Sequence, residues 1–255
     1  MRRRKYPLLE YDSKIPAIIE PGKVVKPIDP PEGCVFCFFQ EVINKFAQEG
    51  RTKIIAHQQW EDMDRPLYET EIEGERLAVI HPGVGAPLAA ALLEEIIARG
   101  CRKFIACGGA GVLNQELAVG HLLVPTVAVR DEGTSFHYLP PGREVNAHPK
   151  AVEAIETTLR QNRVGYLLAK TWTTDGPYRE TPEKIKLSKA EGCLTVEMEA
   201  AAFFAVAQFR GIQFGQILYA GDDVSGSAWD RREWQGRLDV REQLFWLAAE
   251  ACLRL

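Results

Sequence analysis

Short apolar runs alternate with helical periodicity from about residue 75 to the C-terminus. The runs with the apolar and β-branched content of buried strands are residues 77–81, 104–107, 122–130, 165–173 and 214–220. Helical patterns cover residues 32–49, 87–99, 148–162, 182–191, 199–210 and 238–254. This alternation predicts an α/β protein built on a parallel or mixed sheet.

One domain accounts for most of the chain. Residues 21–31 hold four prolines, which is typical of a rigid loop or arm and not of a linker between two balanced halves. A chain of 255 residues, 46% of them hydrophobic, can bury one large core. We therefore expect an N-terminal arm with a proline-rich loop at residues 1–31 and an α/β domain at residues 32–255.

Charge and hydropathy exclude two classes of partner. The net charge of -4 argues against a general nucleic-acid binder, which needs a basic surface to neutralise phosphates. No apolar stretch approaches the roughly 20 residues of a membrane span. The basic residues 1–5 are not followed by the apolar segment of a signal peptide. We expect a cytoplasmic protein with no nucleic-acid or membrane partner.

Six cysteines are spread over the chain, at positions 34, 37, 101, 107, 193 and 252. Their spacing does not suggest a dense disulfide framework. Cys34 and Cys37 have the spacing of a metal or redox pair, but there is no second close pair. The intervening Val35 and Phe36 indicate a buried helix or strand instead. We assign no metal site.

The segment Glu197-Met198-Glu199 places two carboxylates between an apolar strand and an apolar helix. A glutamate at the positive end of a helix dipole explains one of these charges, with an effect below about 1 kcal/mol. It does not explain two carboxylates with a methionine between them. The segment is therefore the first candidate for chemistry.

Two glycine-rich loops follow neighbouring strands. Gly83-Val84-Gly85 opens the helix at 87–99, where backbone amides favour an anion. A dinucleotide fingerprint would need a third glycine where Leu88 stands. Gly108–Gly111 follows the next strand, at the sheet edge where α/β proteins bind ligands. An ordinary tight turn explains the first loop equally well.

Charged loops follow three further strands, at residues 130–135, 174–179 and 221–226. In the second loop, Asp175 and Tyr178 pair a carboxylate with a ring that can cover a flat ligand, although an Asp-Gly-Pro turn is the simpler alternative. In the third, Asp222 is either a helix cap or an acid. The adjacent Asp223 leaves that choice open.

Taken in this order, these motifs resemble the family of uridine phosphorylases, purine nucleoside phosphorylases and related nucleosidases. The resemblance runs from about residue 71 to the C-terminus. It implies a single-domain, three-layer α/β/α fold with a mixed, partly barrel-like central sheet. It also implies a homo-oligomer, a dimer or a hexamer.

The resemblance implies roles on the sugar side of the site. Glu199 would hold the ribose 2′- and 3′-hydroxyls and stabilise the cationic sugar of the transition state, Met198 would pack against the ribose, and Glu197 would support this wall. A carboxylate with two oxygens matches a cis-diol.

The resemblance also implies a base side. Asp222 would protonate the departing base, as an aspartate does in the members that cleave purine nucleosides. Asp175, Pro177 and Tyr178 would lie near the base. The glutamine and arginine that read uracil in the family are absent after Tyr178, so uridine specificity is not supported.

The phosphate side departs from the family pattern. Ala106 and Gly109 stand where phosphorolytic relatives carry an arginine and a hydroxyl residue. The N-terminal phosphate loop is replaced by a segment in which Gly22 and Lys26 are the candidates, with a lysine that lacks the fork of arginine. The remaining phosphate candidates are Arg65, Gly83, Gly85, Gly108, Gly109 and Arg130.

The resulting hypothesis is a nucleoside phosphorylase that uses phosphate as co-substrate, without a metal or organic cofactor. Two alternatives stay open. One is a nucleosidase that uses water in place of phosphate, and the other is an inactive nucleoside-binding relative.

Overall fold

The computed structural model describes residues 3–13 and 16–255. The strands are β1 (Gly33–Cys37), β2 (Thr52–Gln59), β3 (Asp64–Ile72), β4 (Glu75–Ile80), β5 (Lys103–Val112), β6 (Leu122–Asp131), β7 (Glu144–Asn146), β8 (Tyr166–Thr174), β9 (Cys193–Glu197) and β10 (Gln213–Asp223). The α-helices are α1 (Pro21–Val24), α2 (Gln40–Gln48), α3 (Ala86–Arg99), α4 (Pro149–Gln161), α5 (Pro182–Ala190), α6 (Ala200–Arg210) and α7 (Leu238–Leu253). Short 3-10 turns lie at Pro7–Leu9, Thr134–His137, Pro177–Arg179 and Trp234–Gly236.

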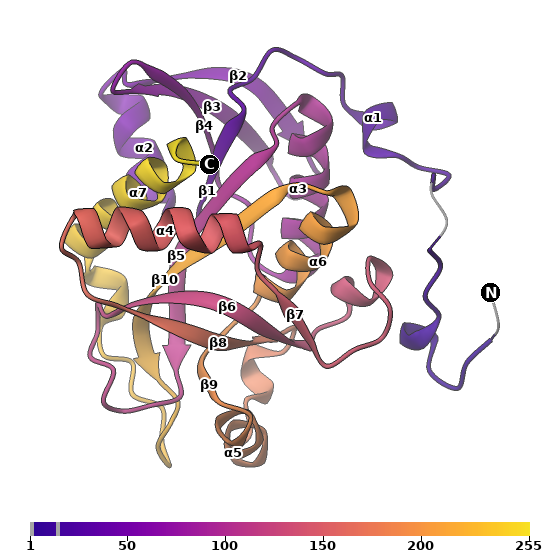
Figure 1. The fold of residues 1–255 in the computed structure, drawn as a ribbon, viewed down its shortest axis with the longest axis vertical. Coiled ribbons are helices and arrows are strands. Elements are labelled where there is room, and N and C mark those ends of the chain that lie inside the picture. Colours follow the sequence, from indigo (N-terminus) through magenta and orange to yellow (C-terminus); the bar gives the residue numbers. More distant parts are fainter. Residues whose placement is uncertain (1–2, 14–15) are drawn as a thin grey trace.

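The strands form one mixed sheet that closes partly into a barrel. The pairings β10–β6, β6–β8, β8–β9, β9–β5 and β5–β10 complete a ring, and β1, β4, β3 and β2 continue outward from β5. Figure 1 shows α2 and α7 on one side of this sheet and α3 and α6 on the other. The predicted fold class, a mixed and partly barrel-like sheet between helices, is confirmed.

Aromatic side chains fill the core between the sheet and the pair α3 and α6. Phe203 of α6 stacks on Phe214 of β10 with ring centroids 4.6 Å apart, and Phe36 of β1 meets Phe203 edge-on at 5.6 Å. Such pairs add about 0.5–1.5 kcal/mol each beyond their burial. The core fixes α6, whose N-terminus begins at the Glu197–Glu199 segment.

Three predictions for individual elements need correction. Residues 33–37 form the fully buried strand β1, and helix α2 begins only at Gln40. An apolar run that is buried on both faces has no period that separates a strand from a helix. Gly108–Gly111 continue β5 instead of ending it. Strands β2 and β3 lie in a region to which the sequence pattern assigned no element.

The N-terminal arm lies against α3 and α6. It contacts the C-terminal end of α3, whereas Gly85 lies at the N-terminal end. The backbone amide of Ile28 donates to the carbonyl of Arg99, and the Arg210 guanidinium pairs with Glu20 at 3.4 Å. The division of the chain at residue 31 stays a proposal.

Each cysteine is free and buried. Burial raises the pKa of the Cys34 and Cys107 thiols, which makes them poor nucleophiles. Within residues 3–13 and 16–255, no helix is long and apolar enough to cross a membrane.

Candidate active site

A cavity of about 390 Å³ lies where the parallel strands β5 and β10 end. Its predicted lining residues include Gly108, Gly109, Pro177 and Asp222, together with the segment 197–199. A larger cavity of about 670 Å³ lies between the arm and α3 and contains none of the predicted site residues. The smaller cavity is therefore the candidate site.

Glu197 is a fixed part of the wall of this cavity. Its Oε2 accepts hydrogen bonds from the backbone amides of Glu199 and Ala200, at 2.7 and 2.6 Å. Its Oε1 accepts from the hydroxyl of Thr173 on β8 at 2.5 Å, and the Thr173 hydroxyl in turn accepts from the amide of Ala201 at 3.0 Å. These contacts tie β8 to the first turn of α6 and set the position of Glu199.

Glu199 lines the cavity, and one of its two carboxylate oxygens accepts a hydrogen bond from the backbone. Its Oε1 accepts from the amide of Gly85 at 2.6 Å, and the residue is 6% exposed. Among the described residues, no side chain donates a hydrogen bond to Oε2. Gly85 has φ +96°, a conformation that favours glycine and aims its amide at the carboxylate. A buried carboxylate with a free oxygen suits a pair of sugar hydroxyls.

Burial controls the ionisation of this pair. It raises the pKa of Glu199, and the neighbouring Glu197 carboxylate raises it further. Burial also raises the pKa of Glu197, although the hydrogen bonds from Thr173 and from two backbone amides oppose this shift. Because Glu197 accepts more hydrogen bonds, we assign the charge first to Glu197, and Glu199 must lose its proton before it acts on the sugar as a carboxylate.

Asp222 and Glu180 form a second pair of carboxylates in the same cavity. The indole Nε1 of Trp229 donates to Asp222 Oδ2 at 2.6 Å. Burial, and then the charge of Asp222, raise the pKa of Glu180 to about 7. Glu180 can therefore hold a proton near neutral pH, beside the carboxylate of Asp222.

The geometry separates Asp222 from its neighbour Asp223. Asp223 forms an ion pair with Arg232 and accepts from the amide of Ser225 at 2.7 Å. Asp223 therefore stabilises the loop that follows β10, while Asp222 lines the cavity. Arg237 pairs with Asp239 at 3.4 Å and gives Asp222 no hydrogen bond.

Gly108 and Gly109 line the cavity through their backbones because aromatic rings fill the space of a side chain. A Cβ atom at Gly108 would meet the Phe38 ring at 3.2 Å, and one at Gly109 would meet Trp234 at 2.9 Å. This wall is apolar, and Ala106 beneath it is fully buried.

The amides of Gly83 and Gly85 are occupied by groups of the chain itself. Gly83 donates to His81 Nδ1 at 3.0 Å, and Gly85 donates to Glu199. The anion at the start of α3 is therefore the Glu199 carboxylate. This arrangement does not support the predicted binding of phosphate by these two glycines.

Gly22 and Lys26 do not reach the cavity. The carbonyl of Lys26 accepts from Arg99, the last residue of α3. Gly85 caps the other end of this 14-residue helix, about 21 Å away at 1.5 Å per residue. The loop that follows β1 and borders the cavity carries Phe38 and Phe39 instead.

Two predicted phosphate-binding arginines are engaged elsewhere. Arg65 is 7% exposed and binds Asp62 through both terminal nitrogens, at 3.0 and 2.6 Å. Arg130 donates to Ser135 and to the carbonyl of Pro140, both at 2.8 Å, so it closes its own loop. Neither arginine lines the cavity.

The loop at residues 174–179 contributes Pro177 but not the predicted ring. The carboxylate of Asp175 accepts from the amide of Gly133 at 2.8 Å and joins two loops. Tyr178 is 98% exposed and does not line the cavity. A strand-end loop fixes the backbone position of its residues but not the direction of each side chain.

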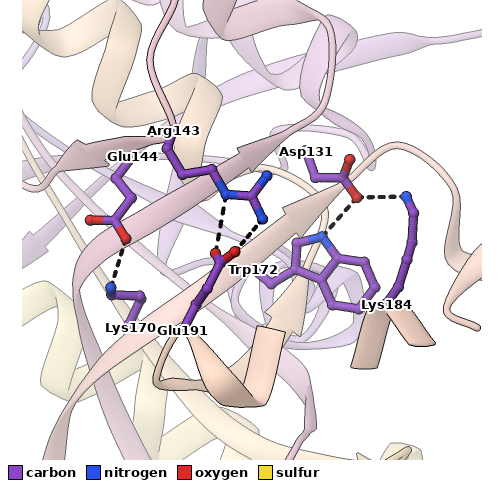
Figure 2. A network of polar contacts seen from close by, with 7 residues as sticks. All are labelled: Asp131, Arg143, Glu144, Lys170, Trp172, Lys184 and Glu191. Atoms are coloured by element: carbon purple, nitrogen blue, oxygen red, sulfur yellow. Dashed lines mark hydrogen bonds and ion pairs between the residues drawn. The ribbon is translucent and has the colours of Figure 1, made fainter. Parts of the chain in front are cut away.

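A network of ion pairs braces β8, the strand that carries Thr173 (Figure 2). Asp131 of β6 accepts from the Trp172 indole at 3.0 Å and from Lys184 of α5 at 2.7 Å. The network is completed by two ion pairs, Arg143 with Glu191 and Lys170 with Glu144. These contacts hold β6, β8 and α5 together beneath the Glu197 wall.

Sequence reasoning missed several residues that line the cavity, namely Phe38, Phe39, Glu180, Gln216, Trp234 and Arg241. Glu180 follows Tyr178 by two positions, directly after a loop that the sequence already marks as part of the site. Gln216 is a polar residue inside an apolar strand, which is itself a signal. Arg241 lies in an amphipathic helix, where nothing in the sequence distinguishes it from a surface arginine.

No group of three or more His, Cys, Asp or Glu residues in the described parts of the chain is arranged to hold a metal ion.

Comparison with known proteins identifies a family and several relatives. A family model described as the phosphorylase superfamily matches residues 34–248. The chain is 31% identical over 166 residues to a guanosine phosphorylase of Halorubrum lacusprofundi, covering 63% of this chain and 67% of that relative. It is 25% identical over 179 residues to a uridine phosphorylase of Salmonella typhimurium, covering 61% of this chain and 71% of the relative.

Solved structures agree on the fold. A purine nucleoside phosphorylase from Toxoplasma gondii in complex with immucillin-H has a TM-score of 0.75 at 20% identity, covering 89% of this chain and 92% of that one. An AMP nucleosidase from Bacteroides thetaiotaomicron has a TM-score of 0.71 at 21% identity, covering 89% and 90%. At such identities the likeness shows the fold alone.

Proposed function

This chain belongs to the phosphorylase superfamily, and we propose that it cleaves the N-glycosidic bond of a purine ribonucleoside with phosphate. The products would be the free base and ribose 1-phosphate. The single observation that carries the proposal is the Glu199 carboxylate, buried in the wall of the cavity with no side chain bound to Oε2.

Cleavage of this bond builds positive charge on the sugar ring, and a preorganised carboxylate stabilises that charge where it develops. Glu199 would accept hydrogen bonds from the ribose hydroxyls through Oε2, while Met198 packs against the ring. Glu197 would not touch the substrate, because both of its oxygens hold the backbone of α6 and Thr173.

Asp222 and Glu180 would act on the base. As the bond from C1′ to the base nitrogen breaks, its electron pair passes to the ring, which must gain a proton. A carboxylate pair that holds one proton near pH 7 is suited to supply it. We assign this proton to the pair, with Asp222 and Glu180 as its two sites.

The ionised member of this pair favours a base edge rich in N–H donors. Guanine presents N1–H beside an exocyclic amino group, which a carboxylate can accept as two parallel hydrogen bonds. Uracil offers one N–H donor between two carbonyl oxygens. The name of the guanosine phosphorylase relative at 31% identity supports the same choice.

Hydrolysis is a second candidate, favoured by the apolar side chains of Phe38 and Phe39 in the wall of the cavity. The test is base release from guanosine, inosine, adenosine and uridine, measured by chromatography with and without phosphate. Phosphorolysis of guanosine predicts release that requires phosphate and yields ribose 1-phosphate. Equal release without phosphate, with free ribose as product, would replace phosphorolysis by hydrolysis. No release from any nucleoside would exclude both.

A further inference from the structure

We propose that the phosphate site of this chain is built from Arg241, Gln216 and the first turn of α2. The proposal deepens the proposed function, since it assigns the position of the attacking phosphate. It also replaces the charged phosphate ligands expected from sequence, Lys26, Arg65 and Arg130, which do not line the cavity.

Arg241 is the one cation among the described residues that line the cavity. It extends from α7, and its side chain is 15% exposed. Its guanidinium lies 4.7 Å from the centre of the Phe39 ring, and one terminal nitrogen donates to Glu41 at 2.6 Å. The Nε–H group is buried and has no hydrogen-bond partner. An arginine held in this way has an N–H to spare for a ligand.

Gln216 is a buried polar residue in the wall of the cavity. It lies on β10, in register with Ala106 of β5, and it is 1% exposed. Its side chain lines the cavity, yet its Oε1 has no hydrogen-bond partner. A buried amide without a partner is costly, by about 1–3 kcal/mol, unless a ligand satisfies it.

The first turn of α2 borders the same corner. The helix begins at Gln40 after Phe39, and no side chain caps its first amides. Phe38 and Phe39 both line the cavity, so these amides start at its edge. Orphan amides and the helix dipole favour an anion at this point. The first amides of this nine-residue helix would bind the anion together with the two side chains.

Hydrogen phosphate matches this set of groups. Its oxygens can accept from Arg241 Nε and from the Gln216 amide nitrogen, and its hydroxyl can donate to the Gln216 amide oxygen. Attack forms a bond between a phosphate oxygen and C1′ and breaks the bond from C1′ to the base nitrogen. The electron pair goes to the base, which takes its proton from Asp222 and Glu180.

Glu41 sets the direction of the arginine. It pairs with NH1 and is 39% exposed, so it lies on the solvent side of Arg241. The pair engages one terminal nitrogen and leaves Nε without a hydrogen-bond partner.

The experiment measures base release against phosphate concentration for Arg241→Gln, Arg241→Lys and Gln216→Leu. Arg237→Gln is the matched control, because Arg237 is an exposed arginine that pairs with Asp239 outside the cavity. Titration calorimetry with inorganic phosphate alone measures binding directly, and thermal unfolding verifies that each variant is folded.

We expect Arg241→Gln to raise the KM for phosphate about 10- to 100-fold, the effect of losing a charge-assisted hydrogen bond. The KM for the nucleoside should change less than about threefold. Arg241→Lys should be intermediate because it keeps the charge without the fork. Gln216→Leu should raise the KM for phosphate about fivefold or more, and Arg237→Gln should match the wild type.

Equal phosphate KM values in Arg241→Gln, Gln216→Leu and the control would overturn the site while leaving phosphorolysis intact. Base release that is equally fast without phosphate would overturn both. If no nucleoside is cleaved, the proposed function fails and calorimetry decides on the site. Phosphate binding that is lost in Arg241→Gln would then support it, and absence of binding in the wild type would overturn it.

Discussion

Replacement of Thr173 by valine tests whether the Glu197 wall positions the catalytic groups. The hydroxyl donates to Glu197 at 2.5 Å and accepts from the amide of Ala201 at 3.0 Å, and Thr173 is fully buried. Loss of a hydrogen bond to a charged group costs about 1.5–3 kcal/mol, and an orphaned buried amide costs about 1–3 kcal/mol. The added methyl group returns about 0.8 kcal/mol through burial.

The free energy of unfolding should therefore fall by about 2–5 kcal/mol in Thr173→Val. For a chain of this size the Tm should fall by about 4–20 °C. Because Glu197 also holds the amide of Glu199, kcat/KM should fall by about 10- to 100-fold, as expected for a small displacement of a reacting group.

Thr171→Val is the matched control. Thr171 lies on the same strand with the same burial, but its hydroxyl is 3.4 Å from the carbonyl of Thr195 and 3.5 Å from Glu197. Such long contacts are weak, so its loss of stability should stay below about 1 kcal/mol. Urea unfolding and initial-rate kinetics measure both effects. If the two variants lose the same stability and activity, the account of the wall is wrong.

Four further predictions follow from the site. Burial raises the pKa of Glu199 above the unfolded value of about 4.3, so the folded protein holds more protons between these two pKa values. The free energy of unfolding should thus decrease as pH rises through this window, and Glu199→Gln should flatten the decrease in urea unfolding from pH 5 to 8. Asp222→Asn should lower kcat for a purine nucleoside by about 10²- to 10⁴-fold, and a loss below fivefold would remove Asp222 from proton transfer. Glu180→Gln should reduce the ratio of kcat/KM for guanosine over inosine by about tenfold, through the lost bond to the 2-amino group. Tyr178→Ala should change kcat/KM less than about twofold, because its ring is exposed, and a tenfold loss would show that the ring closes over the base.

The sequence predicts the fold well where one face of each element is buried. The helices α4 and α7 have the predicted positions within a few residues because their buried residues recur at helical spacing on one face. Strand β1 was mistaken for the start of a helix because Cys34 to Cys37 are buried on every side. An apolar run without alternation carries no information about its period.

The sugar side of the site is predictable because its chemistry is local. Glu197 and Glu199 are charges between two apolar segments, and their contacts with Thr173 and Gly85 depend on the fold that those segments specify. The opposite side is not local. Arg241 comes from the C-terminal helix, while Lys26, predicted from a short Pro-Gly motif, lies at the far end of α3.

The most direct test of the central claim compares guanosine with 2′-deoxyguanosine in the wild type and in Glu199→Gln. If Glu199 Oε2 binds the ribose hydroxyls, the wild type should prefer guanosine in kcat/KM by about tenfold or more, the value of a hydrogen bond to a charged group. In Glu199→Gln the preference for guanosine over 2′-deoxyguanosine should fall to about twofold. The variant has lost the charged acceptor, so removal of the 2′-hydroxyl from the substrate costs little more. An equal preference in both proteins would contradict the assignment of Glu199 to the sugar.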